Sequence, residues 1–177
     1  MNRKMINYFI VMCIVILFDQ LTKYFALVNQ AFVANEGMLF GSFSDTSAVI
    51  RISLITSGSI IFFIIYFFMM FFLSDKLKIL KMGISFLFGG AISNAIDKVY
   101  LNFVVDFIPI SFGDYIFYAN VSDIIQLFGV GIILYYIFLC QDDIWFPDDK
   151  RGVILVSPSS QIKFALKFFI VCICSLL

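Results

Sequence analysis

The sequence of 177 residues is 62% hydrophobic and 19% aromatic, and its mean hydropathy is +1.04. Soluble domains are about half apolar, so this composition excludes a water-soluble globular protein and predicts an integral membrane protein with one domain over residues 1–177. The net charge is zero, which gives no reason to expect a nucleic-acid partner, and the chain has no histidine, which disfavours a zinc site.

The first apolar run predicts a membrane-spanning helix over residues 5–28. Basic residues precede it, as in a signal peptide, but no small-residue cleavage site follows and the run continues without a break. Asp19 and Lys23 are spaced to share one face of this helix, where they can form an ion pair. Two interpretations stay open: the pair only makes two charges tolerable in the membrane, or it positions a group near the outer surface.

The first loop covers residues 29–49 and is apolar for a connector. It contains Asn35, Gly37 and Gly41, with alternating stretches that are compatible with short strands. Such a loop either lies on the membrane interface like a flap or is an ordinary amphipathic connector.

Three further spans are predicted over residues 50–73, 79–97 and 121–140. The turn between the second and third spans carries three lysines, and two more basic residues lie at the N-terminus. Because basic residues favour the cytoplasmic side, the N-terminus and this turn are predicted to be cytoplasmic. The longer loops, 29–49 and 98–119, are then extracytoplasmic.

The tail over residues 141–177 has no assigned role. Its last apolar stretch, residues 164–177, is short for a span. This segment either lies in the membrane interface or begins a fifth helix.

The acidic residues collect in the outer half of the predicted bundle. Asn94 and Asp97 share one helix face at the end of the third span, and Asn120 and Asp123 repeat that spacing where the fourth begins. For the second pair, capping of the helix is a sufficient alternative explanation. Asp106 has no such explanation, because it lies in a β-branched run. A buried, unpaired carboxylate is costly, so Asp106 is expected to have a partner.

Asp123 is the best candidate for that partner, because the second outer loop must return to the fourth span. Two neighbouring aspartates do not both ionise easily, so they share a proton. One can then act as a base on water while the other protonates or polarises a carbonyl. This pattern predicts hydrolytic acid–base chemistry that needs no histidine, cysteine or metal.

At this point the sequence resembles bacterial lipoprotein signal peptidase, also called signal peptidase II. The resemblance rests on five blocks in the family's order: Asp19-Gln-Leu-Thr22-Lys23, Asn35-Glu-Gly37-Met-Leu-Phe40-Gly41, Gly89-Gly90-x-x-Ser93-Asn94-x-x-Asp97, Val104-Val105-Asp106-Phe107 and Asn120-Val-Ser-Asp123. Each block is weak alone, but all five in order on a chain with four spans are specific.

The resemblance implies an aspartic endopeptidase of the bacterial cytoplasmic (inner) membrane, with its site at the extracytoplasmic face. Its fold would be four transmembrane helices with a small β-like cradle in the loop over residues 29–49. Its substrate would be a prolipoprotein carrying a diacylglyceryl cysteine, cut just before that residue, with the apolar part held in a groove between helices. Asp106 and Asp123 would be the catalytic pair. The residues expected to bind substrate or brace the site are Asp19, Lys23, Asn35, Gly37, Asn94, Asp97 and Asn120.

The resemblance also implies that no cofactor or metal is needed, and we expect the chain to act as a monomer among membrane lipids. Three positions depart from the family: Lys98 where arginine is usual, Asn102 where glycine is usual, and Ser122 where alanine is usual. Asparagine tolerates the left-handed conformation, so a turn at Asn102 is expected to survive. The hydroxyl of Ser122 is expected either to cap the helix or to perturb the aspartate pair.

Two alternatives belong to other classes. A small proton or ion conduit would use membrane carboxylates, but it predicts acidic residues spread through the depth of the bilayer. A structural subunit would use the polar groups only to pair helices, and single Asp→Asn changes would then mainly alter stability.

Overall fold

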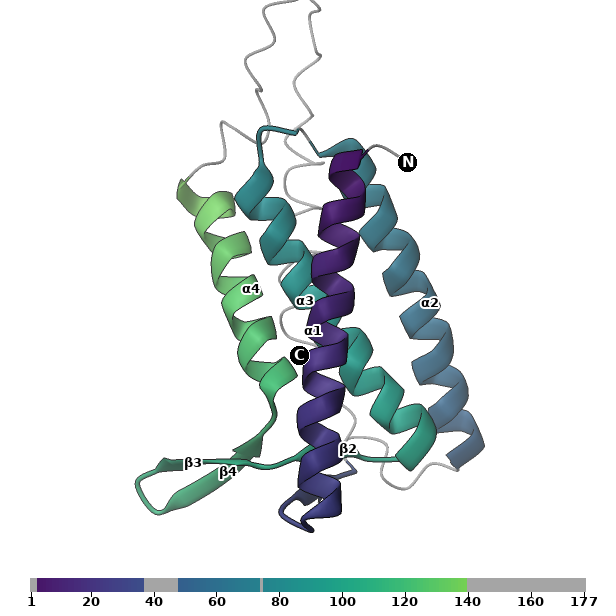
Figure 1. Ribbon diagram of the computed structural model, residues 1–177, viewed down its shortest axis with the longest axis vertical. Helices are drawn as coiled ribbons and strands as arrows, with labels where there is room; N and C mark the ends of the chain where they lie inside the picture. The colour runs from purple at the N-terminus through teal and green to yellow at the C-terminus, as the bar shows by residue number, and fades with distance from the viewer. Residues whose placement is uncertain (1–2, 37–47, 74, 140–177) are drawn as a thin grey trace, which may run out of the picture.

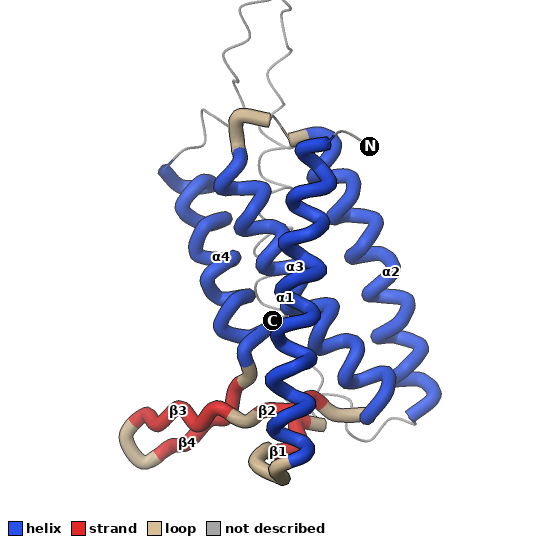
Figure 2. Tube along the Cα trace, viewed as in Figure 1, coloured by secondary structure: helices blue, strands red, loops and turns tan. Residues whose placement is uncertain are grey.

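The computed structural model describes residues 3–36, 48–73 and 75–139. Four long helices run side by side, and the strands gather at one end of them (Figures 1 and 2). The helices are α1 (Arg3–Val28), α2 (Ala48–Phe72), α3 (Lys78–Leu101) and α4 (Val121–Leu139). All four are long and apolar enough to cross a membrane, so the chain is a multi-pass membrane protein, as predicted.

The third helix is longer than predicted. It continues past residue 97 and ends at Leu101, because Asn102 then adopts a left-handed conformation with φ of 68° and its N–H bonds to the carbonyl of Lys98. The expectation that Asn102 would serve in place of glycine is therefore confirmed. The predicted loop over residues 98–119 is correspondingly shorter at its start.

The helix α3 is the centre of the bundle and packs against α1, α2 and α4. Two adjacent glycines let the neighbouring helices approach closely. Gly89 lies against Val15 of α1, and Gly90 lies against Gln126 of α4, where an added Cβ would be only 2.4 Å from Cγ of Gln126. The apolar core of the bundle contains Met12, Tyr66, Met70, Leu77, Leu80, Ile84, Leu87, Phe88 and Ile133.

In the described part of the chain, four short strands form two antiparallel pairs: β1 (Val33–Asn35) with β2 (Val104–Asp106), and β3 (Ile108–Phe112) with β4 (Tyr115–Ala119). The pairing of β1 with β2 sets Val33 opposite Asp106. The predicted strands in the first outer loop are thus confirmed for β1, and they pair with the second loop. Gly37 and the rest of the predicted cradle, residues 37–47, lie outside the described residues, as does the tail from residue 140 onward.

The hairpin β3–β4 was not predicted. It turns at Gly113, which has φ of +60°, and projects sideways from the helices at the strand-bearing end (Figure 1). Several of its aromatic side chains are exposed, among them Phe112, Tyr115 and Phe117. Aromatic residues are favoured where a membrane meets water, so this position suits an interfacial hairpin.

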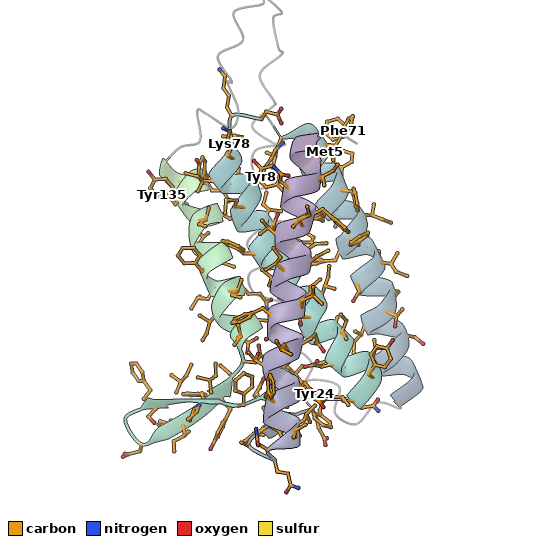
Figure 3. The ribbon with its side chains drawn as sticks, viewed as in Figure 1. Met5, Tyr8, Tyr24, Phe71, Lys78 and Tyr135 are labelled. Carbon is orange, nitrogen blue, oxygen red and sulfur yellow. The ribbon has the colours of Figure 1, made fainter. Side chains whose placement is uncertain are left out.

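The opposite end of the bundle carries the lysine-rich turn. Figure 3 shows Lys78 there with Met5 and Phe71, while Tyr24 lies near the strands. Lys81, also of this turn, is buried: its Nζ donates to the carbonyl of Met70 and pairs with Asp75 at 3.3 Å. Lys81 therefore joins the end of α2 to the start of α3.

Candidate active site

A buried lysine lies at the centre of a polar cluster at the strand-bearing end. Lys23 is 1% exposed, and its Nζ lies 2.7 Å from Oδ2 of Asp19 and 2.8 Å from Oδ2 of Asp97. The same Nζ donates to Oδ1 of Asn94 at 2.7 Å. A buried charge is tolerable only when it is paired and hydrogen-bonded, and this lysine has both kinds of partner. The predicted pair of Asp19 and Lys23 thus exists and extends from α1 to α3.

The two carboxylates of this cluster reach further elements. Asp19 accepts hydrogen bonds from the hydroxyl of Ser93 and the backbone N–H of Ser122, both at 2.7 Å. Asp97 accepts one from Nε2 of Gln20 at 2.7 Å and one from the N–H of Val105 at 3.3 Å. The cluster therefore fixes α1, α3, α4 and β2 relative to one another.

Asp106 is 3% exposed and lies at the end of β2. Both of its oxygens accept hydrogen bonds, Oδ2 from Nδ2 of Asn35 at 2.9 Å and Oδ1 from Nδ2 of Asn120 at 2.8 Å. Burial raises the pKa of Asp106, and the negative charge of Asp123 raises it further. The bonds from Asn35 and Asn120 and the charge of Lys23 oppose this rise without cancelling it.

Asp123 lies in the first turn of α4 and forms a reciprocal cap with Asn120. Oδ1 of Asn120 accepts the N–H of Asp123, and Oδ2 of Asp123 accepts the N–H of Asn120, both at 3.0 Å. The other oxygen of Asp123 accepts Nδ2 of Asn94 at 2.9 Å. Capping was one explanation for these residues, and the structure shows that they cap α4 while also reaching the cluster.

The sequence-predicted residues therefore meet at one end of the bundle. Asn120 contacts both aspartates of the predicted pair: its backbone N–H bonds to Asp123 and its side chain bonds to Asp106. The predicted residues brought together with them are Asp19, Lys23, Asn35, Asn94 and Asp97.

Sequence reasoning missed the parts played by Gln20 and Ser93. Gln20 Nε2 donates both to Asp97 and to the hydroxyl of Ser93. Both residues are polar positions inside predicted spans, directly beside Asp19 and Asn94. Polar residues in a span usually face the bundle interior, so the polar character of Gln20 and Ser93 could have indicated that they join the cluster.

An apolar groove of about 500 Å³ runs along α4 from Ile124, the residue after Asp123. It is lined also by Ile79 of α3 and by Tyr135 near the other end of α4. The remaining lining residues are Leu127, Phe128, Gly131 and Ile132. Most of these side chains are exposed, so the groove lies on the outer face of α4, and neither Asp106 nor Asp123 lines it.

Comparison with known proteins agrees with this geometry. The family model for signal peptidase (SPase) II matches residues 11–139. A lipoprotein signal peptidase of Listeria welshimeri is 33% identical over 149 residues, covering 75% of this chain and 93% of that protein. One of Enterococcus faecalis is 29% identical over 163 residues, covering 86% of this chain and 99% of its own.

A solved structure also matches: a bacterial membrane enzyme determined by the in meso method at 2.3 Å resolution superimposes with a TM-score of 0.60. It is 25% identical, and the match covers 83% of this chain and 94% of that one. The fold and the family match define a membrane peptidase, with four candidate membrane-spanning helices among the described residues. The chain belongs to the signal peptidase II family, which confirms the resemblance drawn from the five sequence blocks.

Proposed function

We propose that this protein is an aspartic endopeptidase that removes signal peptides from diacylglyceryl-modified prolipoproteins and cuts just before the lipidated cysteine. Its membership of the signal peptidase II family supports the substrate class. The observation that carries the catalytic assignment is the double contact of Asn120, which bonds to Asp106 with its side chain and to Asp123 with its backbone. Two carboxylates that share a hydrogen-bonding partner suit the general acid and general base roles.

The two aspartates have different surroundings, which supports different roles. Asp123 is half-buried at the N-terminus of α4, where the helix dipole favours negative charge. Asp106 is buried and its pKa is raised, which favours its protonated form. In the proposed reaction, Asp123 removes a proton from water while the water oxygen attacks the scissile carbonyl carbon, and Asp106 gives its proton to the carbonyl oxygen. Collapse of this intermediate breaks the C–N bond. The proton on Asp123 passes to the leaving nitrogen, and one hydroxyl proton of the intermediate returns to Asp106 as the carboxyl product forms.

The remaining site residues position this pair. Asn94 donates to Asp123 and is itself held by Lys23, which Asp19 and Asp97 neutralise. Asn35 donates to Asp106 from the first outer loop. Residues far apart in the chain thereby fix the orientation of both carboxylates. Gly37 is proposed to bind substrate or brace the site.

The site is proposed to face the outside of the bacterial cytoplasmic membrane. The lysine-rich turn lies at the opposite end of the helices, and basic residues favour the cytoplasmic side. The apolar groove along α4 is proposed to hold the apolar part of the substrate, because apolar side chains line it. The protein is proposed to act as a monomer.

The test uses purified protein in detergent and a synthetic prolipoprotein peptide, with and without its diacylglyceryl group. We expect cleavage of the lipidated peptide alone, at the bond before the modified cysteine, and loss of cleavage in Asp106→Asn and Asp123→Asn. Asp75→Asn is a matched control at the far end of the bundle and should cleave normally. Thermal unfolding of each variant separates lost chemistry from lost folding.

Retained cleavage in both aspartate variants would refute the aspartic mechanism. If the folded wild type cleaved nothing, proton flux into liposomes would be measured instead. Flux that Asp106→Asn and Asp123→Asn abolish would favour a conduit over a peptidase.

A further inference from the structure

Ser122 lies between the two asparagines that hold the proposed catalytic pair. Its side chain is fully buried, and its Oγ lies 2.7 Å from Oδ1 of Asn94 and 2.6 Å from Oδ1 of Asn120. The opposite end of each amide donates to one aspartate: Asn94 to Asp123 and Asn120 to Asp106. The Asn120 nitrogen also donates to Oδ1 of Asn94, at 3.2 Å. A single hydroxyl thus contacts both of the amides that hold the two carboxylates.

Independent contacts fix the orientation of both amides. Oδ1 of Asn94 accepts Nζ of Lys23, and Oδ1 of Asn120 accepts the N–H of Asp123. Neither amide can turn its nitrogen toward Ser122 without losing such a bond. The hydroxyl therefore faces two acceptor oxygens but carries one proton, so it can donate to only one of them at a time.

Hydrogen bonds in a chain polarise one another in a buried site. An amide whose oxygen accepts a bond donates more strongly from its nitrogen, and a stronger donor stabilises the ionised form of the carboxylate that it contacts. When the Ser122 proton lies toward Asn94, the bond to Asp123 gains strength. When it lies toward Asn120, the bond to Asp106 gains strength.

We infer that Ser122 is a positioning residue whose hydroxyl proton is shared between Asn94 and Asn120 and thereby tunes which of Asp106 and Asp123 carries the negative charge. The inference rests on the proposed function and goes beyond it, because it adds a residue that touches neither aspartate through its side chain. The hydroxyl adjusts the site and is not required for assembling it, since the backbone N–H of Ser122 separately holds Asp19 at 2.7 Å.

Other charged groups surround the pair and stay in place when the hydroxyl is removed. They are Asp19 and Lys23 on α1 and Asp97 on α3, joined by the ion pairs described above. A change in pH dependence after removal of the hydroxyl alone is therefore assignable to Ser122. Alanine removes only the hydroxyl and favours helix, so the truncated variant is expected to fold.

The test compares Ser122→Ala and Ser122→Thr with the wild type in kcat, KM and thermal unfolding across pH. We expect Ser122→Ala to lose about three- to tenfold in kcat with little change in KM, which is the loss of roughly one hydrogen bond. The acid limb of its pH–rate profile should move to higher pH, because the ionised carboxylates lose hydrogen-bond support. Ser122→Thr keeps the hydroxyl, so its kcat and the acid limb of its pH–rate profile should match those of the wild type.

The control is Ser85→Ala, another fully buried serine, whose hydroxyl bonds to the carbonyl of Lys81 far from the site. It should change the melting temperature at most. The inference would be overturned if Ser122→Ala had the kcat and the acid limb of the wild type. It would also be overturned if Ser85→Ala showed the same changes as Ser122→Ala.

An infrared titration of the protonated carboxyl band needs no catalysis and separates the two proposals. The midpoint is expected to shift to higher pH in Ser122→Ala, and the band should weaken in Asp106→Asn. A shifted midpoint in a protein that cleaves nothing would refute the proposed function alone. An unchanged midpoint in an active enzyme would refute the role of Ser122 alone.

Discussion

The side chain of Asn120 donates a hydrogen bond to Oδ1 of Asp106 across 2.8 Å, from the residue that caps α4. The same side chain therefore stabilises a helix end and orients a buried carboxylate. Its Oδ1 serves the cap and its Nδ2 serves Asp106, so the two roles use different atoms. Substitutions that keep one atom and remove the other can separate the roles.

We predict that Asn120→Ser keeps most of the stability but loses most of the activity, because serine caps helices well and cannot reach Asp106 as asparagine does. Asn120→Ala should lose both, with about 1 kcal/mol of stability lost from the cap. Thermal unfolding and cleavage of a lipidated peptide would be measured for both variants. Equal activity in Asn120→Ser and wild type would mean that the bond to Asp106 has no part in catalysis.

The buried carboxyl of Asp106 predicts a specific dependence of stability on pH. Its pKa in the folded protein is raised by burial, so the unfolded chain ionises first as the pH increases. Below the ordinary aspartate pKa of about 3.9 the group is protonated in both states, so its titration does not change the free energy of unfolding. Between that value and the raised pKa the folded protein binds more protons than the unfolded chain, and stability falls as the pH rises.

Asp106→Asn removes this titration. The melting temperature of the wild type, relative to that of the Asn variant, should therefore decline from acidic toward neutral pH. Unfolding scans in detergent over this range provide the measurement. A difference that stayed constant with pH would show that Asp106 titrates normally in the folded protein.

The helices and the strand at Asp106 were predictable because they depend on local patterns. Apolar runs of sufficient length give the spans, and a β-branched run gives β2. Asn102 ended α3 where its tolerance of a positive φ suggested a turn. The span predicted to end at residue 97 continues as α3 to Leu101, an extension that the apolar pattern does not indicate.

The hydrogen-bond network was only partly predictable. Helical spacing indicated that Asp19 and Lys23 would pair, since both lie on one helix. Nothing in the sequence indicated that the backbone N–H of Ser122 would bond to Asp19, because that contact depends on how α1 packs against α4. The β3–β4 hairpin was not predicted either. Its aromatic residues are compatible with a strand but equally with an irregular loop at the membrane interface, so the pattern does not distinguish the two.

The ion cluster around Lys23 predicts a large loss of stability when its charge is removed. Lys23→Met leaves Asp19 and Asp97 buried without a counter-charge, which typically costs about 3–5 kcal/mol. Lys78→Met is the matched control, because Lys78 is exposed at the other end of the bundle. Melting temperatures in detergent should fall strongly for the first variant and little for the second.

A double variant tests the cause of that loss. Asp97→Asn introduced into Lys23→Met removes one unpaired charge, so the pair of changes should cost less than the sum of the single ones. Strict additivity would indicate that Lys23 contributes through packing of its side chain and not through its charge.

Two glycines of α4 provide the last prediction. A Cβ on Gly129 would lie 2.6 Å from the carbonyl oxygen of Gly83 and 2.9 Å from the backbone nitrogen of Leu87, and backbone atoms of a packed helix cannot move aside cheaply. A Cβ on Gly131, one half-turn away, would meet nothing within 4 Å. We expect Gly129→Ala to destabilise the bundle by about 1–3 kcal/mol, by forcing α3 and α4 apart.

Gly131→Ala should leave the melting temperature unchanged or raise it, because alanine favours helix more than glycine does. The same comparison tests whether the site depends on the approach of these helices. Asn94 and Asp123 bond across the same interface, so Gly129→Ala should also slow cleavage. A destabilised Gly129→Ala variant with wild-type kcat would mean that the strand-bearing end holds its geometry independently of the helix contacts below it.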